Sequence, residues 1–380
     1  MKKKLAICTV YHRPAAIPKD SSYKPILVGS KVLNQASKDG FVSNEEWKAF
    51  IEEPGLLMDG EGEDNLSDLN RYVNEMSGIY WVWKNYDEIG SPEIIGLSHY
   101  RRFFIFNESL PLPSRTWLPN SSCFIFDSLE SAAPYFDSSF ISHFFDIGFD
   151  CLTTKMYDAR LLEPARSPNV ASCEERFYEI ADFDPALYKE MERLVLQAHP
   201  EYLTELENLR KAPSHYTFNM FVMKKELFLS YCNFIFPILR QLALTNSRTD
   251  NPTLMRAPGY LSEFLTSIFL SNRIRLHGLK VKELNTCYIE NTQFKPKGCN
   301  GEKEIEGSED SFSTREAVVF SIELMIYLVS LGKVVHRDKI DKKKYQWRRA
   351  KSVSYSSNLL KKGLNFSSRC FSRLSNILRV

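Results

Sequence analysis

Residues 94–97 constrain the fold most, because they form an apolar strand that leads into four polar or charged side chains, His99, Tyr100, Arg101 and Arg102. In open α/β sheets, ligands bind beyond the carboxyl ends of the strands, where two guanidinium groups suit a phosphate-bearing ligand such as a sugar nucleotide. The alternative is an arginine pair that bonds carboxylates at a sheet edge. Adjacent residues of an extended strand point to opposite faces. We therefore expect only one of the two arginines to touch phosphate, unless the strand has already turned.

The first apolar run of the chain predicts a second strand of the same sheet. Residues 5–10 would deliver Tyr11 and His12 at its carboxyl end. This run is too short for a secretory signal, so none is expected despite the basic residues before it. With 380 residues, 43% hydrophobic and 25% charged, the chain can bury a substantial core in one large domain or two smaller ones.

The cysteines indicate a reduced protein in which these residues are mostly structural. They include no CxxC pair and no close set of Cys and His ligands, so neither disulfides nor a zinc site is expected. The eight are Cys8, Cys123, Cys151, Cys173, Cys232, Cys287, Cys299 and Cys370.

Charge is distributed unevenly along the chain. Residues 333–380 hold 14 Lys and Arg against two Asp, a net charge of +12, whereas residues 1–332 hold 35 basic and 45 acidic residues, a net charge of −10. The apolar residues 317–332 are too few for a spanning helix and predict a buried or interfacial one. Because apolar residues alternate with the cations of the tail, attachment to an anionic membrane surface is one interpretation. A solvated end and a nucleic-acid-binding segment are the alternatives, and the acidic body argues against the last.

Between the two strands, a loop at residues 59–67 precedes a helix that we expect to begin near Asn70. The helical spacing of Tyr72, Met76, Tyr80 and Trp83 is typical of a core face. Asn65, Asn70 and Glu75 flank the helix start, where free backbone N–H groups favour an anion. For Asn70 and Ser67, helix capping is the favoured interpretation.

A possible metal motif occurs further along the chain. Asp182 and Asp184 form the Asp-x-Asp pattern with which many sugar-nucleotide enzymes hold a divalent cation. The second Asp directly precedes Pro185, so a cap for a helix over residues 185–198 is the favoured interpretation. The acidic residues in 59–64 lack the ordered oxygen ligands of a calcium loop.

Two more blocks contribute candidate polar residues. Residues 216–224 predict a strand with one polar insertion, Asn219, which is either a satisfied buried amide or a substrate ligand, and a helix follows at 226–239. Gly259 opens a further helix with Glu263 near its first turn, where the macrodipole favours an ionised carboxylate. Glu263 is therefore a candidate general base, with a simple helix-start Glu as the alternative. Residues 279–284 predict another strand.

Several short motifs in fixed order resemble one known family, the bacterial capsular-polysaccharide and O-antigen glycosyltransferases catalogued as domain of unknown function 4422. The resemblance spans residues 4 to about 290, and residues 105–185 contribute little to it. Its motifs are Tyr11-His12; Pro18, Tyr23, Pro25-Ile26 and Val28-Gly29; Asp64-Asn65, Ser67 and Asn70; Glu75 and Tyr80 to Asn85; Ile95 to Phe103; Asn219 to Lys224; and Gly259 to Glu263.

The resemblance implies a Rossmann-like, type-A glycosyltransferase fold, an α/β fold with a central mixed sheet flanked by helices, here followed by a helical basic C-terminal tail. The expected domains are a catalytic domain at residues 1–300 and, at 301–380, a linker, an apolar helix and a membrane-proximal tail. The expected activity is transfer of a sugar from a nucleotide sugar, possibly UDP-galactofuranose, to a surface-polysaccharide acceptor with inversion. The expected location is the inner face of the plasma membrane.

Such a reaction needs stabilisation of the leaving diphosphate, a base for the acceptor hydroxyl and polar groups that hold both sugars. Arg101 and Arg102 are the candidates for the first and Glu263 for the second, with a divalent Mn or Mg ion as a possible addition. The candidate substrate-binding residues are Tyr11, His12, Asn65, Trp83, His99, Tyr100 and Asn219. The rival from another class is a non-catalytic, membrane-associated carbohydrate-binding subunit, which would need neither a phosphate-binding arginine pair nor a base.

Overall fold

The structure, a computed structural model, describes residues 4–32, 44–117, 121–158, 172–180, 184–246, 249 and 251–294, all within one compact unit, Met1–Glu302. The apolar residues 317–332, the basic tail 333–380, Cys299, Cys370 and Asp182 lie outside this part. The six described cysteines are all free and buried.

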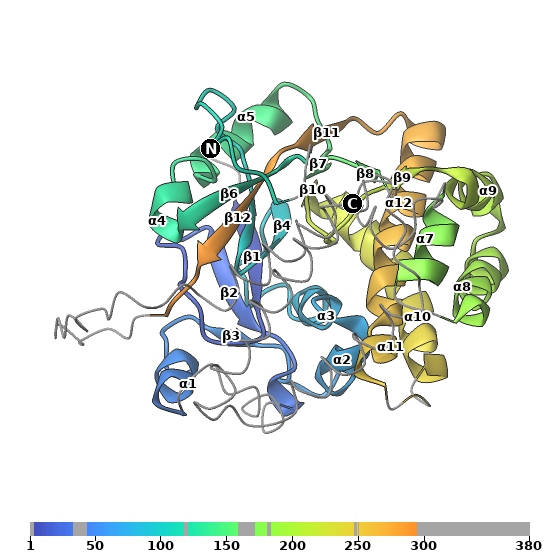
Figure 1. Cartoon of the computed structure of the whole chain (residues 1–380), viewed down its shortest axis with the longest axis horizontal. Coiled ribbons are helices and arrows are strands. Elements are labelled where there is room, and N and C mark those ends of the chain that lie inside the picture. Colours follow the sequence, from blue (N-terminus) through green and yellow to red (C-terminus); the bar gives the residue numbers. More distant parts are fainter. Residues whose placement is uncertain are drawn as a thin grey trace, which may run out of the picture. The chain divides into compact units, whose positions relative to one another are not determined.

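A mixed sheet of ten strands forms the centre of the described unit (Figure 1). Its main path has the order β11-β7-β10-β4-β1-β2-β3, and β12 joins β5 to β6 beside it. Strands β4, β1, β2 and β3 run parallel, whereas β10 is antiparallel to both β4 and β7. The strands of this sheet are β1 Leu5–Tyr11, β2 Tyr23–Leu27, β3 Leu57–Met58, β4 Ile94–His99, β5 Arg102–Phe104, β6 Cys123–Ser128, β7 Cys151–Thr154, β10 Phe221–Lys224, β11 Val281–Leu284 and β12 Thr286–Asn291. The expectation of a central mixed sheet is confirmed.

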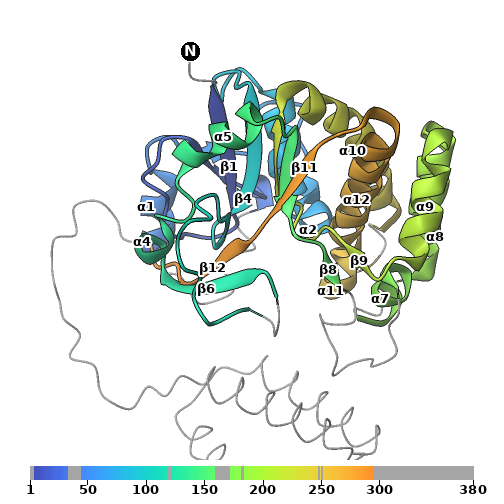
Figure 2. The same cartoon turned by 90° about the horizontal axis from the view of Figure 1, so that it is seen from above.

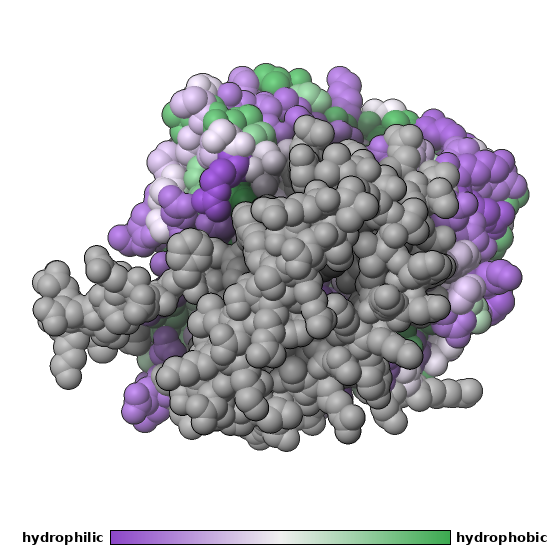
Figure 3. All heavy atoms as spheres, in the orientation of Figure 1, coloured by the Kyte–Doolittle hydropathy of each residue, from purple (hydrophilic) through white to green (hydrophobic). Residues whose placement is uncertain are grey.

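Helices cover the sheet, with α10 and α12 packed side by side and α8 and α9 outside them (Figure 2). The outer faces of α8 and α9 are hydrophilic (Figure 3). The helices are α1 Asn44–Ile51, α2 Asn70–Val73, α3 Met76–Lys84, α4 Leu129–Ala132, α5 Ile141–Asp146, α7 Cys173–Ile180, α8 Pro185–Ala198, α9 Leu203–Lys211, α10 Lys225–Asn246, α11 Pro252–Met255 and α12 Ala257–His277. Short 3-10 turns lie at Ser67–Leu69, Ser138–Phe140 and Pro200–Tyr202, and a separate two-stranded sheet pairs β8 Tyr157–Asp158 with β9 Ser214–His215.

Strand β1 shows why the centre of the sheet is buried on both faces. Ala6, Cys8 and Val10 pack into the core shared with α10 and α12, whereas Ile7 faces a second core formed with β5, β6, β12 and α5. Successive side chains of a strand point to opposite faces. A continuous apolar run, rather than an alternating one, is therefore what this position requires.

Helix α10 is, among the described helices, the one that is long and apolar enough to cross a membrane by length and composition. However, 56% of its apolar window is buried inside the protein. Its buried side chains, such as Phe228, Tyr231 and Leu239, belong to the core beneath the sheet. We therefore interpret its apolarity as that of a core helix.

Three local expectations hold, and two need correction. Strand β11, helix α8 and the cap at Asp184, which accepts a hydrogen bond from the Ala186 N–H, are confirmed. The helix expected from Asn70 is interrupted after α2, because Asn74 has a positive φ of 53°. The strand expected over residues 216–224 is split into β9 and β10, because Phe218 and Asn219 both have positive φ.

Candidate active site

The chain turns at the end of β4, where the two arginines lie. His99 pairs with Arg102 across the β4–β5 hairpin, so Tyr100 and Arg101 form its two-residue turn. Both guanidinium groups consequently lie against the same ring, with Arg101 Cζ 5.5 Å and Arg102 Cζ 5.3 Å from the centroid of Tyr288. In an extended strand the two side chains would point to opposite faces of the sheet. Because the chain turns here, both arginines can face one ligand.

Neither arginine has a carboxylate partner among the described residues. Arg101 donates from Nη1 to the Tyr288 hydroxyl at 2.6 Å, and Arg102 is surrounded by the rings of Phe218, Trp117 and Tyr288, at 4.6, 5.0 and 5.3 Å. The Nε atom of each is buried and has no hydrogen-bond partner. The alternative interpretation, an arginine pair that bonds carboxylates at a sheet edge, is therefore not observed among the described residues.

Further positive charge lies at the end of β1. The guanidinium groups of Arg13 and Arg101 lie 5.4 and 4.8 Å from the centroid of the Tyr100 ring, and the His12 ring packs edge-on against it at 5.0 Å. Desolvation by the surrounding protein, then the charges of Arg13, Arg101 and Arg256, lower the pKa of His12 to about 4, although this side chain reaches solvent. We call Arg13, Arg101, Arg102 and Arg256 the arginine cluster.

His99 is also neutral at physiological pH. Burial and the charge of Arg102 lower the pKa of His99 to about 3, and its Nε2 lies 2.7 Å from the Phe218 carbonyl oxygen, to which a neutral ring donates. Because both His12 and His99 are neutral, the positive charge at this edge of the sheet belongs to the arginines. An anion is the ligand that such an environment favours.

Three of the expected substrate-binding residues have other surroundings. Tyr11 is fully buried, and its hydroxyl donates to the Ala16 carbonyl oxygen. Trp83 stacks on Phe236 of α10 with ring centroids 5.5 Å apart. Asn65 donates to carbonyl oxygens of Gly60 and Gly62 within its own loop. The structure thus gives Tyr11 and Trp83 packing roles and Asn65 a role in loop structure, instead of a place beside the arginines.

The polar residues around the start of α2 hold loops together instead of capping the helix. Asp59 is fully buried and accepts hydrogen bonds from the backbone N–H groups of Gly29 and Ser30 and from the hydroxyls of Ser67 and Ser77. Asn70 donates to the carbonyl oxygen of Asn74 and to the Ser77 hydroxyl. The capping expected of Ser67 and Asn70 is therefore wrong, because a buried carboxylate and the helix break supply stronger partners.

A second group of polar side chains lies where α3, α12 and the residues before β10 meet. Asn219 is buried and donates from Nδ2 to Glu75 Oε1 at 2.5 Å and to Ser262 Oγ at 2.9 Å, while its Oδ1 accepts from Thr266. Burial raises the pKa of Glu75 to about 7, with a smaller contribution from the negative charge of Glu263. The side chain of Glu75 nevertheless remains partly exposed.

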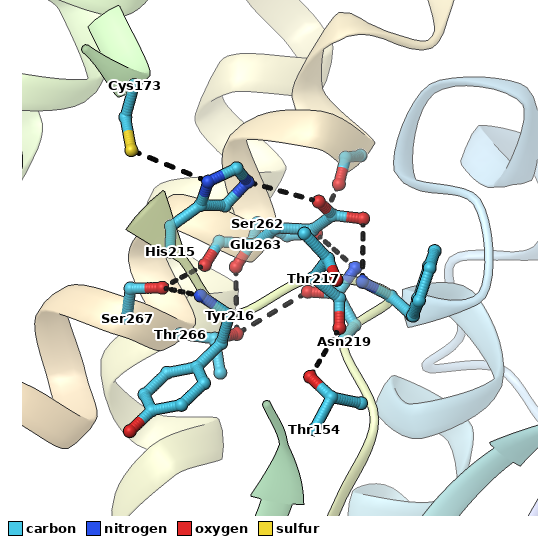
Figure 4. Close-up of polar contacts among 12 residues, drawn as sticks. Thr154, Cys173, His215, Tyr216, Thr217, Asn219, Ser262, Glu263, Thr266 and Ser267 are labelled. Carbon is cyan, nitrogen blue, oxygen red and sulfur yellow. Dashed lines mark hydrogen bonds and ion pairs between the residues drawn. The ribbon is translucent and has the colours of Figure 1, made fainter. Parts of the chain in front are cut away.

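Glu263 lies in this second group and is held by two partners (Figure 4). Its Oε1 accepts the Phe218 N–H at 2.9 Å, and its Oε2 lies 3.6 Å from Nε2 of His215. The other ring nitrogen, Nδ1, lies 3.5 Å from Cys173 Sγ. Burial lowers the pKa of His215 and raises that of Cys173 to about 12, so a thiol hydrogen-bonds a neutral imidazole, whose other nitrogen faces Glu263 at 3.6 Å.

The residues Phe218 and Asn219 connect the two groups. The Phe218 ring contacts Arg102, its backbone N–H bonds Glu263, and Asn219 bonds Glu75. Both have positive φ, 69° and 53°, which is costly for residues other than glycine and persists where the surroundings over-determine it. Arg256 also links the groups, since its charge lowers the pKa values of both His12 and Glu75.

The structure thus brings together His12, His99, Tyr100, Arg101 and Arg102 on one side and Asn219 and Glu263 on the other. Sequence reasoning did not assign roles to Arg13, Glu75, His215, Arg256 or Tyr288. The helix break at Asn74 is what turns Glu75 toward Asn219, and no local pattern predicted it. Among the residues that the structure describes, no group of three His, Cys, Asp or Glu side chains is arranged to hold a metal ion.

The chain is similar to known proteins in sequence and in structure. A family model described as "Domain of unknown function (DUF4422)" matches residues 6–274. This range includes the arginine cluster and the second polar group, but not Tyr288. The chain is similar in structure to the bifunctional glycosyltransferase WbbM in its apo form, with a TM-score of 0.63 and 26% sequence identity. That match covers 77% of this chain and 46% of the other, so the chain spans less than half the length of this relative. No curated protein matches the chain.

Proposed function

The chain belongs to the DUF4422 family, and on this premise we propose that it is a glycosyltransferase that uses a nucleoside-diphosphate sugar as donor. The similarity to a bifunctional glycosyltransferase supports this proposal. The observation that carries it is the arginine cluster, of which Arg13, Arg101 and Arg102 lie at the carboxyl ends of β1 and β4. Arg13, Arg101 and Arg102 have no carboxylate partners among the described residues, and a diphosphate would supply the negative charge that these guanidinium groups lack.

The arginine cluster suits the chemistry of glycosyl transfer. As the bond between the anomeric carbon and the diphosphate oxygen breaks, its electron pair moves to the diphosphate. Guanidinium groups held in place beforehand stabilise this developing charge without reorganisation. A new bond forms from the acceptor oxygen to the anomeric carbon, and the proton of the acceptor hydroxyl passes to a carboxylate. The second group supplies two candidates for that role, Glu75 and Glu263.

The finer assignments extend the proposal. We take the donor to be a UDP-sugar such as UDP-galactofuranose and the acceptor to be a growing surface polysaccharide. We also take the fold to be of the type-A glycosyltransferase class and the outcome to be inverting. A carboxylate near the arginines supports inversion, because a direct displacement requires a base. We further propose that the enzyme acts at the cytoplasmic face of the membrane, which rests on the charge of residues 333–380.

Calorimetric titration of the purified full chain with a panel of UDP-sugars, with and without Mn²⁺, tests the proposal. We expect saturable binding of at least one donor, and release of UDP when a suitable glycan is added. The exposed Arg193→Ala on α8 is the matched control and should bind the donor like the wild type. Absence of binding by the wild type to every donor would overturn the proposal. Binding of a glycan without any sugar nucleotide would instead support a carbohydrate-binding subunit.

A further inference from the structure

We infer that Glu75, and not Glu263, accepts the proton of the acceptor hydroxyl, and that Glu263 is a positioning residue for the turn at Phe218 and Asn219. This inference rests on the proposed glycosyl transfer. It assigns separate roles to two carboxylates that lie in the same polar group, and it differs from the expectation that Glu263 is the base.

The contacts of Glu263 leave it poorly placed to take a proton. Each of its oxygens already faces a donor, one the Phe218 N–H and the other Nε2 of His215. Its side chain is 15% exposed. Movement of this carboxylate toward a substrate would break the bond from the Phe218 N–H and leave that donor without its partner.

The same contacts explain what Glu263 does. Phe218 and Asn219 have φ values of 69° and 53°, so their conformation must be held by the surroundings. The bond from the Phe218 N–H to Glu263 fixes the turn, and His215, itself held by Cys173, fixes Glu263. The fixed turn presents the Asn219 amide to Glu75 and the Phe218 ring to Arg102.

Glu75 has the contacts expected of a base. It directly follows the helix break at Asn74, and its side chain remains partly exposed. Its donors within the described ranges are its own backbone N–H and the side chain of Asn219, whose amide is fixed in turn by Ser262 and Thr266. This arrangement orients the carboxylate and leaves lone pairs for a proton from a substrate.

The charged and titratable groups around Glu75 come from three elements. Arg256, just before α12, favours its ionised form, whereas Glu263 of α12 disfavours it. Tyr260 of α12 and Tyr231 of α10 also interact electrostatically with Glu75. Burial raises the pKa of Glu75 more than the charge of Arg256 lowers it, so this pKa is about 7. A general base is most effective when its pKa lies near the operating pH.

In the proposed step, the acceptor O–H bond breaks and its proton moves to the Glu75 carboxylate. The acceptor oxygen forms the bond to the anomeric carbon, and the electron pair of the broken glycosyl–phosphate bond leaves with the nucleoside diphosphate. Glu75 loses its proton to solvent before the next cycle, so the reaction balances without any redox partner.

The kinetic test compares Glu75→Gln and Glu263→Gln in the full chain, with Glu207→Gln on the exposed face of α9 as the matched control. Glutamine keeps an oxygen for the Asn219 amide but cannot take a proton, so we expect Glu75→Gln to lower kcat by about 10²–10⁴ at unchanged donor Kd. The acidic limb of the kcat–pH profile, with a midpoint near 7, should disappear in this variant. Glu263→Gln should lower kcat less, retain the acidic limb and lower Tm, because it loosens the turn.

A second measurement does not depend on turnover. Carbon-13 NMR of the glutamate carboxyl groups should show one resonance that titrates near pH 7 in the wild type and that is missing in Glu75→Gln. In Glu263→Gln this resonance should remain and titrate at a somewhat lower pH, because a charge that raises the pKa of Glu75 has been removed. Wild-type rates in Glu75→Gln, or loss of the acidic limb in Glu263→Gln, would overturn the assignment of Glu75 while leaving the proposed function in place. A wild type that binds no sugar nucleotide would overturn the proposed function itself, whatever the titration shows.

Discussion

Arg101 and Arg102 are neighbours in the chain, but their surroundings differ. Arg101 lies in the hairpin turn and donates to one hydroxyl, whereas Arg102 is enclosed by three aromatic rings. A guanidinium enclosed by rings contributes to stability through cation–π contact and through packing of its stem. At the residue scale, this difference predicts that the pair divides its roles between ligand and fold.

We predict that Arg101→Ala weakens donor binding about 10- to 100-fold, since a hydrogen bond to a charged group contributes about 1.5–3 kcal/mol. Arg102→Ala should instead lower the free energy of unfolding by about 1–3 kcal/mol, mainly by removing contacts with Phe218, Trp117 and Tyr288. Calorimetry and urea denaturation of both variants, beside Arg193→Ala, are the measurements. Small and equal effects of the two substitutions would contradict the division.

The raised pKa of Glu75 gives a prediction about stability that needs no substrate. A carboxyl group whose pKa is raised by folding binds more protons in the native state, so its stabilising contribution is present below the unfolded pKa of 4.5 and is lost as pH rises through about 7. Glu75→Gln mimics the protonated form. We therefore expect its Tm to exceed that of the wild type above pH 7, and the difference to vanish toward pH 4.5.

Thermal unfolding at several pH values measures this difference. Glu207→Gln, at an exposed position of α9, is the control for the loss of a carboxyl group. If the difference in Tm between Glu75→Gln and the wild type is the same at every pH, folding does not change the proton affinity of Glu75.

At the scale of elements, the contact between α2 and α12 positions the second polar group. A Cβ built at Gly259 would lie 1.9 Å from Asn74 Nδ2, so only glycine lets α12 approach the residue at which the helix breaks. Asn74 also accepts a hydrogen bond from Arg256 Nε at 3.2 Å. The spacing of the two elements therefore determines where Glu75, Arg256 and Glu263 lie relative to one another.

Gly259→Ala should consequently destabilise the protein by about 1–3 kcal/mol, the usual cost of overpacking, although alanine ordinarily favours a helix over glycine. We also expect kcat to fall, because α12 moves away from Glu75. Chemical denaturation and kinetics are the measurements, with Thr245→Ala on the exposed side of α10 as a helical control. A variant as stable as the wild type would show that Asn74 can move aside without cost.

At the scale of the whole molecule, the acidic body and the basic tail of residues 333–380 predict reversible attachment to membranes. Each cation near an anionic lipid surface contributes about 1 kcal/mol, and apolar residues such as Trp347 and Phe366 add insertion. A lipid-linked acceptor would then be met at raised effective concentration. This prediction rests on the sequence, since the tail lies outside the described residues.

Truncation after Gly332 should abolish co-sedimentation with anionic vesicles and leave donor binding intact. The full chain should sediment with such vesicles at low salt and dissociate from them at high salt, because screening weakens the attraction. It should not bind neutral vesicles. If the full chain and the truncated protein both stay in the supernatant at low salt, the tail is a solvated end or a segment for a protein partner.

Local patterns in the sequence determined several elements of this protein and one end of its site. The apolar runs of β1 and β4, the cap at Asp184 with helix α8, and the placement of Arg101 and Arg102 at the end of a strand all followed from periodicity and capping. Ordered short motifs led to the DUF4422 family, which the match over residues 6–274 confirms. These features were accessible because each depends on residues that are close in the chain.

Only the tertiary structure decided which side chains meet. Glu75 and Asn219 are 144 residues apart, and His99 meets the Phe218 carbonyl across 119. The positive φ of Phe218 runs against the local preference of a bulky residue, whereas asparagine tolerates positive φ more readily at positions 74 and 219. The sequence therefore located the arginines. Only packing could turn the hairpin, enclose Arg102 and bring Glu75 beside Asn219, because these contacts depend on how the elements fit together.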